Sequence, residues 1–123
     1  MPRFALLIHD GPRGLHYDFF LEAGQTLKTW ALPHLPEPGA AFSCEALADH
    51  RSIYLDYEGP ISGGRGTVSR WDGGDYEAEA WSDNEVIVQL AGSKISGRIE
   101  LRRQGDSGGQ WRFTWMVAGQ ETV

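Results

Sequence analysis

Cysteine and long apolar runs are both scarce in this chain of 123 residues. Cys44 is the only cysteine, which excludes an intramolecular disulfide and leaves a metal to be held by histidine and carboxylate ligands. No apolar run approaches the length of a membrane span, and residues 1–10 lack the basic region, apolar stretch and cleavage site of a secretory signal. We therefore expect a cytoplasmic protein that makes no contact with a membrane.

Helical periodicity is also nearly absent, and short segments of alternating apolar residues take its place. These segments, rich in β-branched and aromatic residues, are 3–8, 16–21, 27–32, 52–57, 66–71, 75–81, 86–90, 95–102 and 111–117. Many short strands separated by Gly, Pro, Asp and Ser clusters are typical of all-β proteins. The pattern predicts a single domain (1–123), a small antiparallel β-barrel with long loops and at most one or two short helical turns.

Three segments carry more specific expectations. Residues 67–81 ("TVSRWDGGDYEAEAW") are interpreted as a hairpin that turns at Gly73 and Gly74. Residues 43–50 ("SCEALADH") are the best candidate for a short helix, with a strand and loop as the alternative. Residues 33–42 hold three prolines and are predicted to form an ordered crossing loop.

The formal net charge of -6 argues at first sight against a nucleic-acid partner, because contacts to phosphates supply most of the nonspecific affinity. The distribution weakens this argument. Residues 72–85 carry six acids and no lysine or arginine, whereas residues 86–123 carry five basic residues and three acids. Either the surface is polarised, or an acidic edge is simply solvated.

Two of the four histidines lie in "IHDGPRGLHYDFFLE", residues 8–22. On a strand, His16, Asp18 and Phe20 share one face, and the apolar residues between them share the other. The short turn before His16 can bring His9 back beside it. These groups, facing solvent or a barrel cavity, are suited to holding a cation or a phosphate.

A third histidine, His50, precedes another predicted strand, where a ligand on a loop is expected. Two imidazoles and one carboxylate bind a divalent transition metal and leave positions open for water or substrate. Manganese, iron, cobalt and zinc all suit these ligand types. The alternative is that each histidine is an ordinary surface residue.

Four stretches, taken in order, resemble the 3'-phosphoesterase module of bacterial DNA ligase D: "HDGPRGLHYDFFLE", "LKTWALP", "DHRSIYLDYEGPISGGRGTVSRWD" and "LAGSKISGRIELRR". The resemblance extends from Phe4 to Met116. It implies a small β-barrel that uses a divalent metal, typically manganese, in repair of double-strand breaks by nonhomologous end joining. Such a module removes a terminal ribonucleoside and then the remaining 3'-phosphate from a primer strand. We expect a freestanding monomer, with a DNA ligase or end-joining proteins as partners in trans.

The same resemblance assigns roles to particular residues. It implies metal ligation by His9, Asp18 and His50. It also implies that His16 lies beside the scissile phosphate and that Tyr54 contacts this phosphate. Tyr54 has an alternative interpretation as a half-buried aromatic residue of a strand.

Two departures from the family pattern bear on activity. Phe20 stands where the family has an arginine, and the turn between the first two histidines is one residue longer. The missing guanidinium would hold a phosphate through two hydrogen bonds. Three other arginines lie in predicted loops that can face the candidate site: Arg13, Arg51 and Arg65. We expect them to bind substrate in place of the missing guanidinium.

Two further functions stay open on the sequence. The first is a catalytically impaired module of the same barrel that binds a nucleic-acid 3' end or a protein partner. The second takes His16, Asp18 and a later histidine as the two-histidine, one-carboxylate triad of an iron oxygenase. The identity of the histidines that contact the metal separates the oxygenase from the phosphoesterase.

Overall fold

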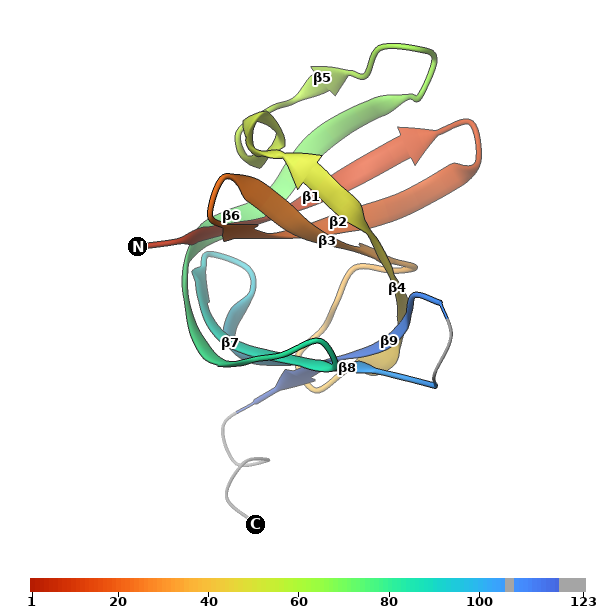
Figure 1. The fold of residues 1–123 in the computed structure, drawn as a ribbon. Helices are drawn as coiled ribbons and strands as arrows, with labels where there is room; N and C mark the ends of the chain where they lie inside the picture. The colour runs from red at the N-terminus through yellow and green to blue at the C-terminus, as the bar shows by residue number, and fades with distance from the viewer. Residues whose placement is uncertain (106–107, 118–123) are drawn as a thin grey trace.

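The computed structural model describes residues 1–105 and 108–117, which form one antiparallel sheet of nine strands and one short 3₁₀ helix (Figure 1). The elements are β1 (Arg3–Gly11), β2 (Gly14–Ala23), β3 (Thr26–Leu32), β4 (Ala41–Arg51), η1 (Ser52–Leu55), β5 (Gly59–Pro60), β6 (Thr67–Trp81), β7 (Glu85–Gly92), β8 (Ser96–Arg103) and β9 (Gln110–Met116). The predicted all-β class, with one short helical turn, is confirmed. No helix of the described residues is long and apolar enough to cross a membrane.

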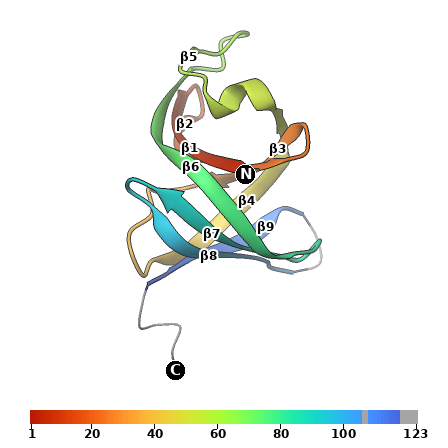
Figure 2. The same ribbon diagram turned by 90° about the vertical axis from the view of Figure 1, so that its left-hand side faces the viewer.

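The sheet closes on itself. Its strand order is β1-β2-β3-β4-β9-β8-β7-β6-β5, and β1 also pairs with β6. The hydrogen-bonded pairings therefore run round a ring of eight strands, to which the two-residue β5 is attached through β6 (Figures 1 and 2). A closed ring removes the exposed strand edges that would otherwise pair with other chains.

Two apolar clusters lie on opposite faces of β1 and β2. The main core, enclosed by the ring, includes Phe4 and Phe19 together with Trp30 and Phe113. The smaller cluster consists of Ala5, Leu7, Phe20, Leu27, Leu55 and Val68. Burial on both faces explains why β1 has a continuous apolar run instead of strict alternation.

The segment 67–81 is one 15-residue strand, so the predicted hairpin at Gly73 and Gly74 is wrong. The first half of β6 pairs with β1 and the second half with β7. A Cβ at Gly74 would lie 2.2 Å from the carbonyl oxygen of Ala91, and one at Gly73 would overlap the Arg70 guanidinium. These glycines permit close approach of neighbouring groups and make no turn.

Two other expectations are settled by strand pairing. Residues 43–50 lie in β4, which pairs with β3 and β9, so the strand alternative is confirmed and the helix is excluded. Pairing on both sides outweighs the weak helical preference of this segment. The predicted strand 52–57 is wrong, because Ser52–Leu55 form the 3₁₀ helix η1 that covers the smaller apolar cluster. The crossing loop ends at residue 40, two residues earlier than predicted, because β4 begins at Ala41.

Candidate metal and phosphate site

The β1–β2 hairpin brings two histidines and one aspartate together. His9 lies directly opposite His16, and Leu7 lies opposite Asp18, so the Asp18 side chain is the diagonal neighbour of His9. The two imidazole ring centroids are 4.4 Å apart. One ligand atom from each of His9, His16 and Asp18 lies within 4.8 Å of the other two. The predicted convergence of these residues is therefore seen in the structure.

This group lies outside the main core. It occupies the face of β1 and β2 that also carries Phe20, at the margin of the smaller cluster. The interior of the ring is filled by the main core. Of the two expected locations, solvent or a barrel cavity, the site therefore takes the outer face of the ring, because the apolar residues of β2 take the inner face.

Asp18 is a buried carboxylate whose two oxygens have different surroundings. Its relative exposure is 3%, and its Oδ2 lies 3.0 Å from Nδ1 of His9. Its Oδ1 lies 3.0 Å from Nε2 of His16, yet among the described residues no donor is aligned for a hydrogen bond to it. An unsatisfied buried carboxylate oxygen is costly, and a cation held by these three groups would satisfy it. The donor set fits a divalent transition metal.

His9 contacts acceptors through both ring nitrogens. Nδ1 faces Asp18, and Nε2 lies 2.8 Å from the carbonyl oxygen of Arg65. A neutral imidazole carries a proton on only one nitrogen. Binding of a metal through His9 therefore requires one of these two contacts to open.

His50 lies in the same cavity but not in the tight group of three. It borders a cavity of about 160 Å³ together with His9, Asp18 and Tyr54. Its Nδ1 donates to the carbonyl oxygen of Ala48 at 2.9 Å, and the remaining nitrogen is then an acceptor that can bind a metal. Ligation by His9, Asp18 and His50 stays a prediction, and His16 competes with His50 for the third position.

Tyr54 is positioned by η1, which begins directly after β4. Its half-buried ring packs edge-on against His50, with 6.2 Å between centroids. Since both rings line the cavity, the end of β4 and the first turn of η1 present them as a pair. The predicted contact of Tyr54 with a phosphate remains untested.

The three candidate arginines differ in their relation to the site. Arg65 borders the cavity of His50 and also a second cavity of about 320 Å³, which Arg13 and His16 share. The Arg65 guanidinium donates to the Ser62 carbonyl oxygen at 2.8 Å. Arg51 is exposed and borders neither cavity. Of the three, Arg13 and Arg65 are thus the arginines that border the cavities of the candidate site.

Two buried titratable groups lie apart from this site. Burial raises the pKa of the Cys44 thiol to about 12, so the thiol is protonated and unreactive near neutral pH. Burial acts to raise the pKa of Asp72, but hydrogen bonds from backbone amides of Ile95, Lys94 and Ser93 outweigh it and hold this pKa below its ordinary value. Neither group borders the cavities that contain His9, although Cys44 borders the groove that extends from His16 across β3 and β4.

Comparison with known proteins defines the class. Residues 8–103 match the family model described as the DNA Ligase D 3'-phosphoesterase domain. The chain is 37% identical over 118 residues to the multifunctional non-homologous end joining protein LigD of Pseudomonas aeruginosa, covering 88% of this chain and 14% of that protein. It is 42% identical over 104 residues to the multifunctional non-homologous end joining DNA repair protein LigD of Mycobacterium tuberculosis, covering 74% and 13%.

The chain therefore belongs to the DNA ligase D 3'-phosphoesterase family. This membership places the chain among phosphoesterase domains. The match gives no support to the iron-oxygenase alternative. Because the chain spans only 13 to 14% of these two relatives, their other activities are not transferred to it.

Proposed function

We propose that this chain is a metal-dependent phosphoesterase that processes nucleic-acid 3' ends during double-strand break repair. It removes a terminal ribonucleoside by cleaving a phosphodiester, and it then removes the remaining 3'-phosphate. The observation that supports this most is the buried carboxylate of Asp18, held between His9 and His16 with one oxygen unsatisfied. Family membership supplies the class of reaction.

His9 and Asp18 are the common members of both possible metal sets, and His50 or His16 completes the set. Manganese is the proposed ion. When bound, such an ion neutralises charge on a phosphoryl oxygen and lowers the pKa of a water molecule. The other groups of the site then act on the phosphate itself.

In the proposed reaction a water oxygen forms a bond to phosphorus while the bond to the leaving oxygen breaks. The leaving oxygen takes up a proton, and His16, which is partly exposed at the junction of two cavities, is the proposed donor. Arg13 and Arg65 are proposed to hold phosphate oxygens of the retained strand. Tyr54 is proposed to orient the scissile phosphate from the η1 side.

The test uses primers that end in a ribonucleotide or in a 3'-phosphate, with manganese present. We expect the wild type to shorten both and the variants His9→Ala and Asp18→Asn to lose at least about 100-fold in rate, as for removal of a ligand or a charge donor at an active site. His34→Ala is the matched control, because His34 is exposed and packs against Phe42 away from the site. Wild type that binds the ion but converts neither primer would contradict the proposal.

Titration calorimetry with manganese decides the third ligand. If His50 is the ligand and His16 the proton donor, His50→Ala weakens ion binding by about 10- to 100-fold and His16→Ala does not. The reverse pattern assigns ligation to His16. If both variants and Asp18→Asn bind manganese with the affinity of the wild type, the proposal of a cation site at these residues is wrong.

A second candidate function rests on Phe20. Its ring is 1% exposed and packs 5.3 Å from the His50 ring, where the family pattern has an arginine. Loss of one preorganised cation reduces transition-state stabilisation by a few kcal/mol. The second candidate function is therefore a module that binds a 3' end without converting it. It predicts that the protein binds primers but forms no product.

A further inference from the structure

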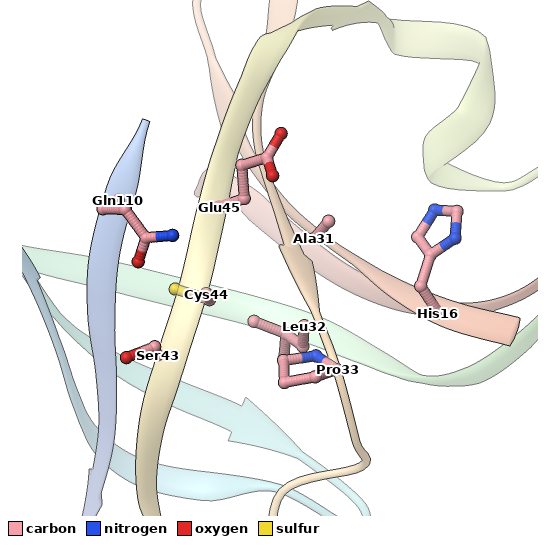
Figure 3. A pocket seen from close by; sticks show the side chains of 8 residues that line it. All are labelled: His16, Ala31, Leu32, Pro33, Ser43, Cys44, Glu45 and Gln110. Carbon is pink, nitrogen blue, oxygen red and sulfur yellow. The ribbon is translucent and has the colours of Figure 1, made fainter. Parts of the chain in front are cut away.

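A groove of about 290 Å³ adjoins the candidate site and takes no part in the chemistry proposed so far (Figure 3). His16 of β2 borders the groove at the end nearest the site. Ala31 of β3, Ser43 and Glu45 of β4, and Gln110 of β9 supply the rest of its outer-face lining. The groove therefore crosses four strands and shares His16 with the site.

Strand register explains the groove. Asp18 lies opposite Ala31, Ala31 lies opposite Glu45, and Glu45 lies opposite Gln110. Directly opposite residues point to the same face, so these four form one row on the face of the candidate site. Two strand spacings separate Asp18 from Glu45, which is about 10 Å. The small side chain of Ala31 leaves the space between Asp18 and Glu45 open. Figure 3 shows Ala31 between Glu45 and His16.

The chemistry of this lining differs from that of the arginine-bordered cavity on the other side of His16. Glu45 is exposed, and within the described ranges no hydrogen bond or ion pair engages its carboxylate. Ser43 and Gln110 add neutral polar groups, and the described lining of the groove contains no lysine or arginine. A carboxylate repels a phosphate and accepts hydrogen bonds from hydroxyl groups. The groove is therefore suited to an uncharged group that carries hydroxyls.

We infer that this groove binds the sugar of the nucleoside that leaves the 3' end, with Glu45 accepting a hydrogen bond from a sugar hydroxyl. The inference rests on the proposed function. A terminal nucleoside has no phosphate beyond the scissile one, which matches a groove without cations. The retained strand continues through further phosphates, which match the cavity of Arg13 and Arg65. His16 lies between the two surfaces, where the scissile phosphate would join the two parts of the substrate.

The first test measures binding and needs no turnover. Fluorescence anisotropy compares primers with a penultimate ribonucleotide that end either in a ribonucleoside or in a 2',3'-dideoxynucleoside. We expect wild type to bind the ribonucleoside end about 10-fold or more tightly, the size of one hydrogen bond to a charged group. Glu45→Gln should lose most of this preference. Glu77→Gln, which removes the same charge from an exposed position on β6, should keep it.

The second test compares turnover of two substrates. Glu45→Gln, and Ala31→Val, which narrows the groove, should each lower the ratio of ribonucleoside removal to 3'-phosphate removal by about 10-fold, mainly through KM. An unchanged ratio in both variants, together with an unchanged binding preference, overturns the inference and leaves the proposed function in place. Wild type that prefers the ribonucleoside end yet converts neither substrate overturns the proposed function and supports the groove assignment.

Discussion

At the scale of single residues, Phe20 is the side chain on which activity and stability depend together. It lies in the smaller cluster with Leu7 and Leu27, and it also borders the cavity that contains His9 and His50. A phenyl ring there strengthens packing and removes a cation from the site. Under the proposed function, Phe20 is therefore expected to stabilise the folded state and to weaken phosphate binding.

Replacement of Phe20 by arginine is expected to destabilise the protein and to increase turnover. Loss of the buried ring and burial of part of a guanidinium should cost about 2 to 4 kcal/mol in the free energy of unfolding, measured by urea denaturation. Phe20→Leu is the control for packing alone. An arginine variant that folds but shows no gain in 3'-phosphate removal would mean that the missing cation does not limit the reaction.

The faces of β2 could be predicted from alternation alone, because a two-residue period fixes which side chains share a side. The structure confirms this for Asp18, which faces the site, and for Phe19, which enters the main core. Glu45 could not be found in this way. Its relation to Asp18 depends on the register of β2, β3 and β4, which is set by long-range pairing and core packing.

At the scale of elements, the β5–β6 turn supports the site through close contact of Gly66 with the end of β1. Gly66 has a φ of +96°, and a Cβ there would lie 2.1 Å from the carbonyl oxygen of Asp10. The neighbouring carbonyl of Arg65 contacts His9. The packing of the β5–β6 turn against the end of β1 therefore helps to position one candidate ligand, His9.

We expect Gly66→Ala to lower the free energy of unfolding by more than about 2 kcal/mol, since backbone strain and a steric clash add. It should also weaken manganese binding where Nδ1 of His9 is the ligand atom, because the Arg65 carbonyl then orients the imidazole through Nε2. Gly24→Ala in the β2–β3 turn is the matched control, with a φ of +64° and no atom within 4 Å of the added Cβ. Equal losses of stability in Gly66→Ala and Gly24→Ala would show that the β5–β6 turn is not in close contact with β1.

Asp72 of β6 stabilises the turn between β7 and β8. Its carboxylate accepts backbone N–H groups of Ser93, Lys94 and Ile95 at 3.1, 2.7 and 2.7 Å. Its pKa is lower in the folded than in the unfolded state, so this stabilisation is present above the unfolded pKa of about 4 and is lost as the pH falls through the folded value.

We expect Asp72→Asn to cost about 1 to 3 kcal/mol at pH 7, measured by urea denaturation. The difference from wild type should shrink as the pH falls below about 4, because the wild-type carboxylate then becomes protonated as well. A difference that is constant down to the acid unfolding range would mean that the charge of Asp72 does not matter.

The long β6 shows where element prediction from sequence fails. Gly73 and Gly74 have the composition of a turn, yet β6 continues because β1 pairs with its first half and β7 with its second. A local pattern cannot report that a strand passes from one neighbour to another. The hairpin of β1 and β2, by contrast, depends on a local turn, and the proximity of His9 to His16 could be predicted from it.

At the scale of the whole molecule, a net charge of -6 must be reconciled with a nucleic-acid substrate. Only Arg13 and Arg65 of the three candidate arginines border the cavities of the site. Each neutralised phosphate contributes about 0.7 to 0.9 to the slope of log K against log salt. Two such contacts predict a shallow slope of about -1.4 to -1.8, so recognition is expected to depend chiefly on the end of the strand.

Primer binding is therefore expected to depend only weakly on monovalent salt concentration, as measured by fluorescence anisotropy. Arg13→Ala should weaken binding to primers of different sequence by a similar factor and reduce the magnitude of the slope by about 1. Arg51→Ala should change the slope less, because Arg51 borders neither cavity. A wild-type slope steeper than about -5 would require a phosphate-binding surface larger than the two arginines at the site provide, and the interface would then have to extend beyond the end of the strand.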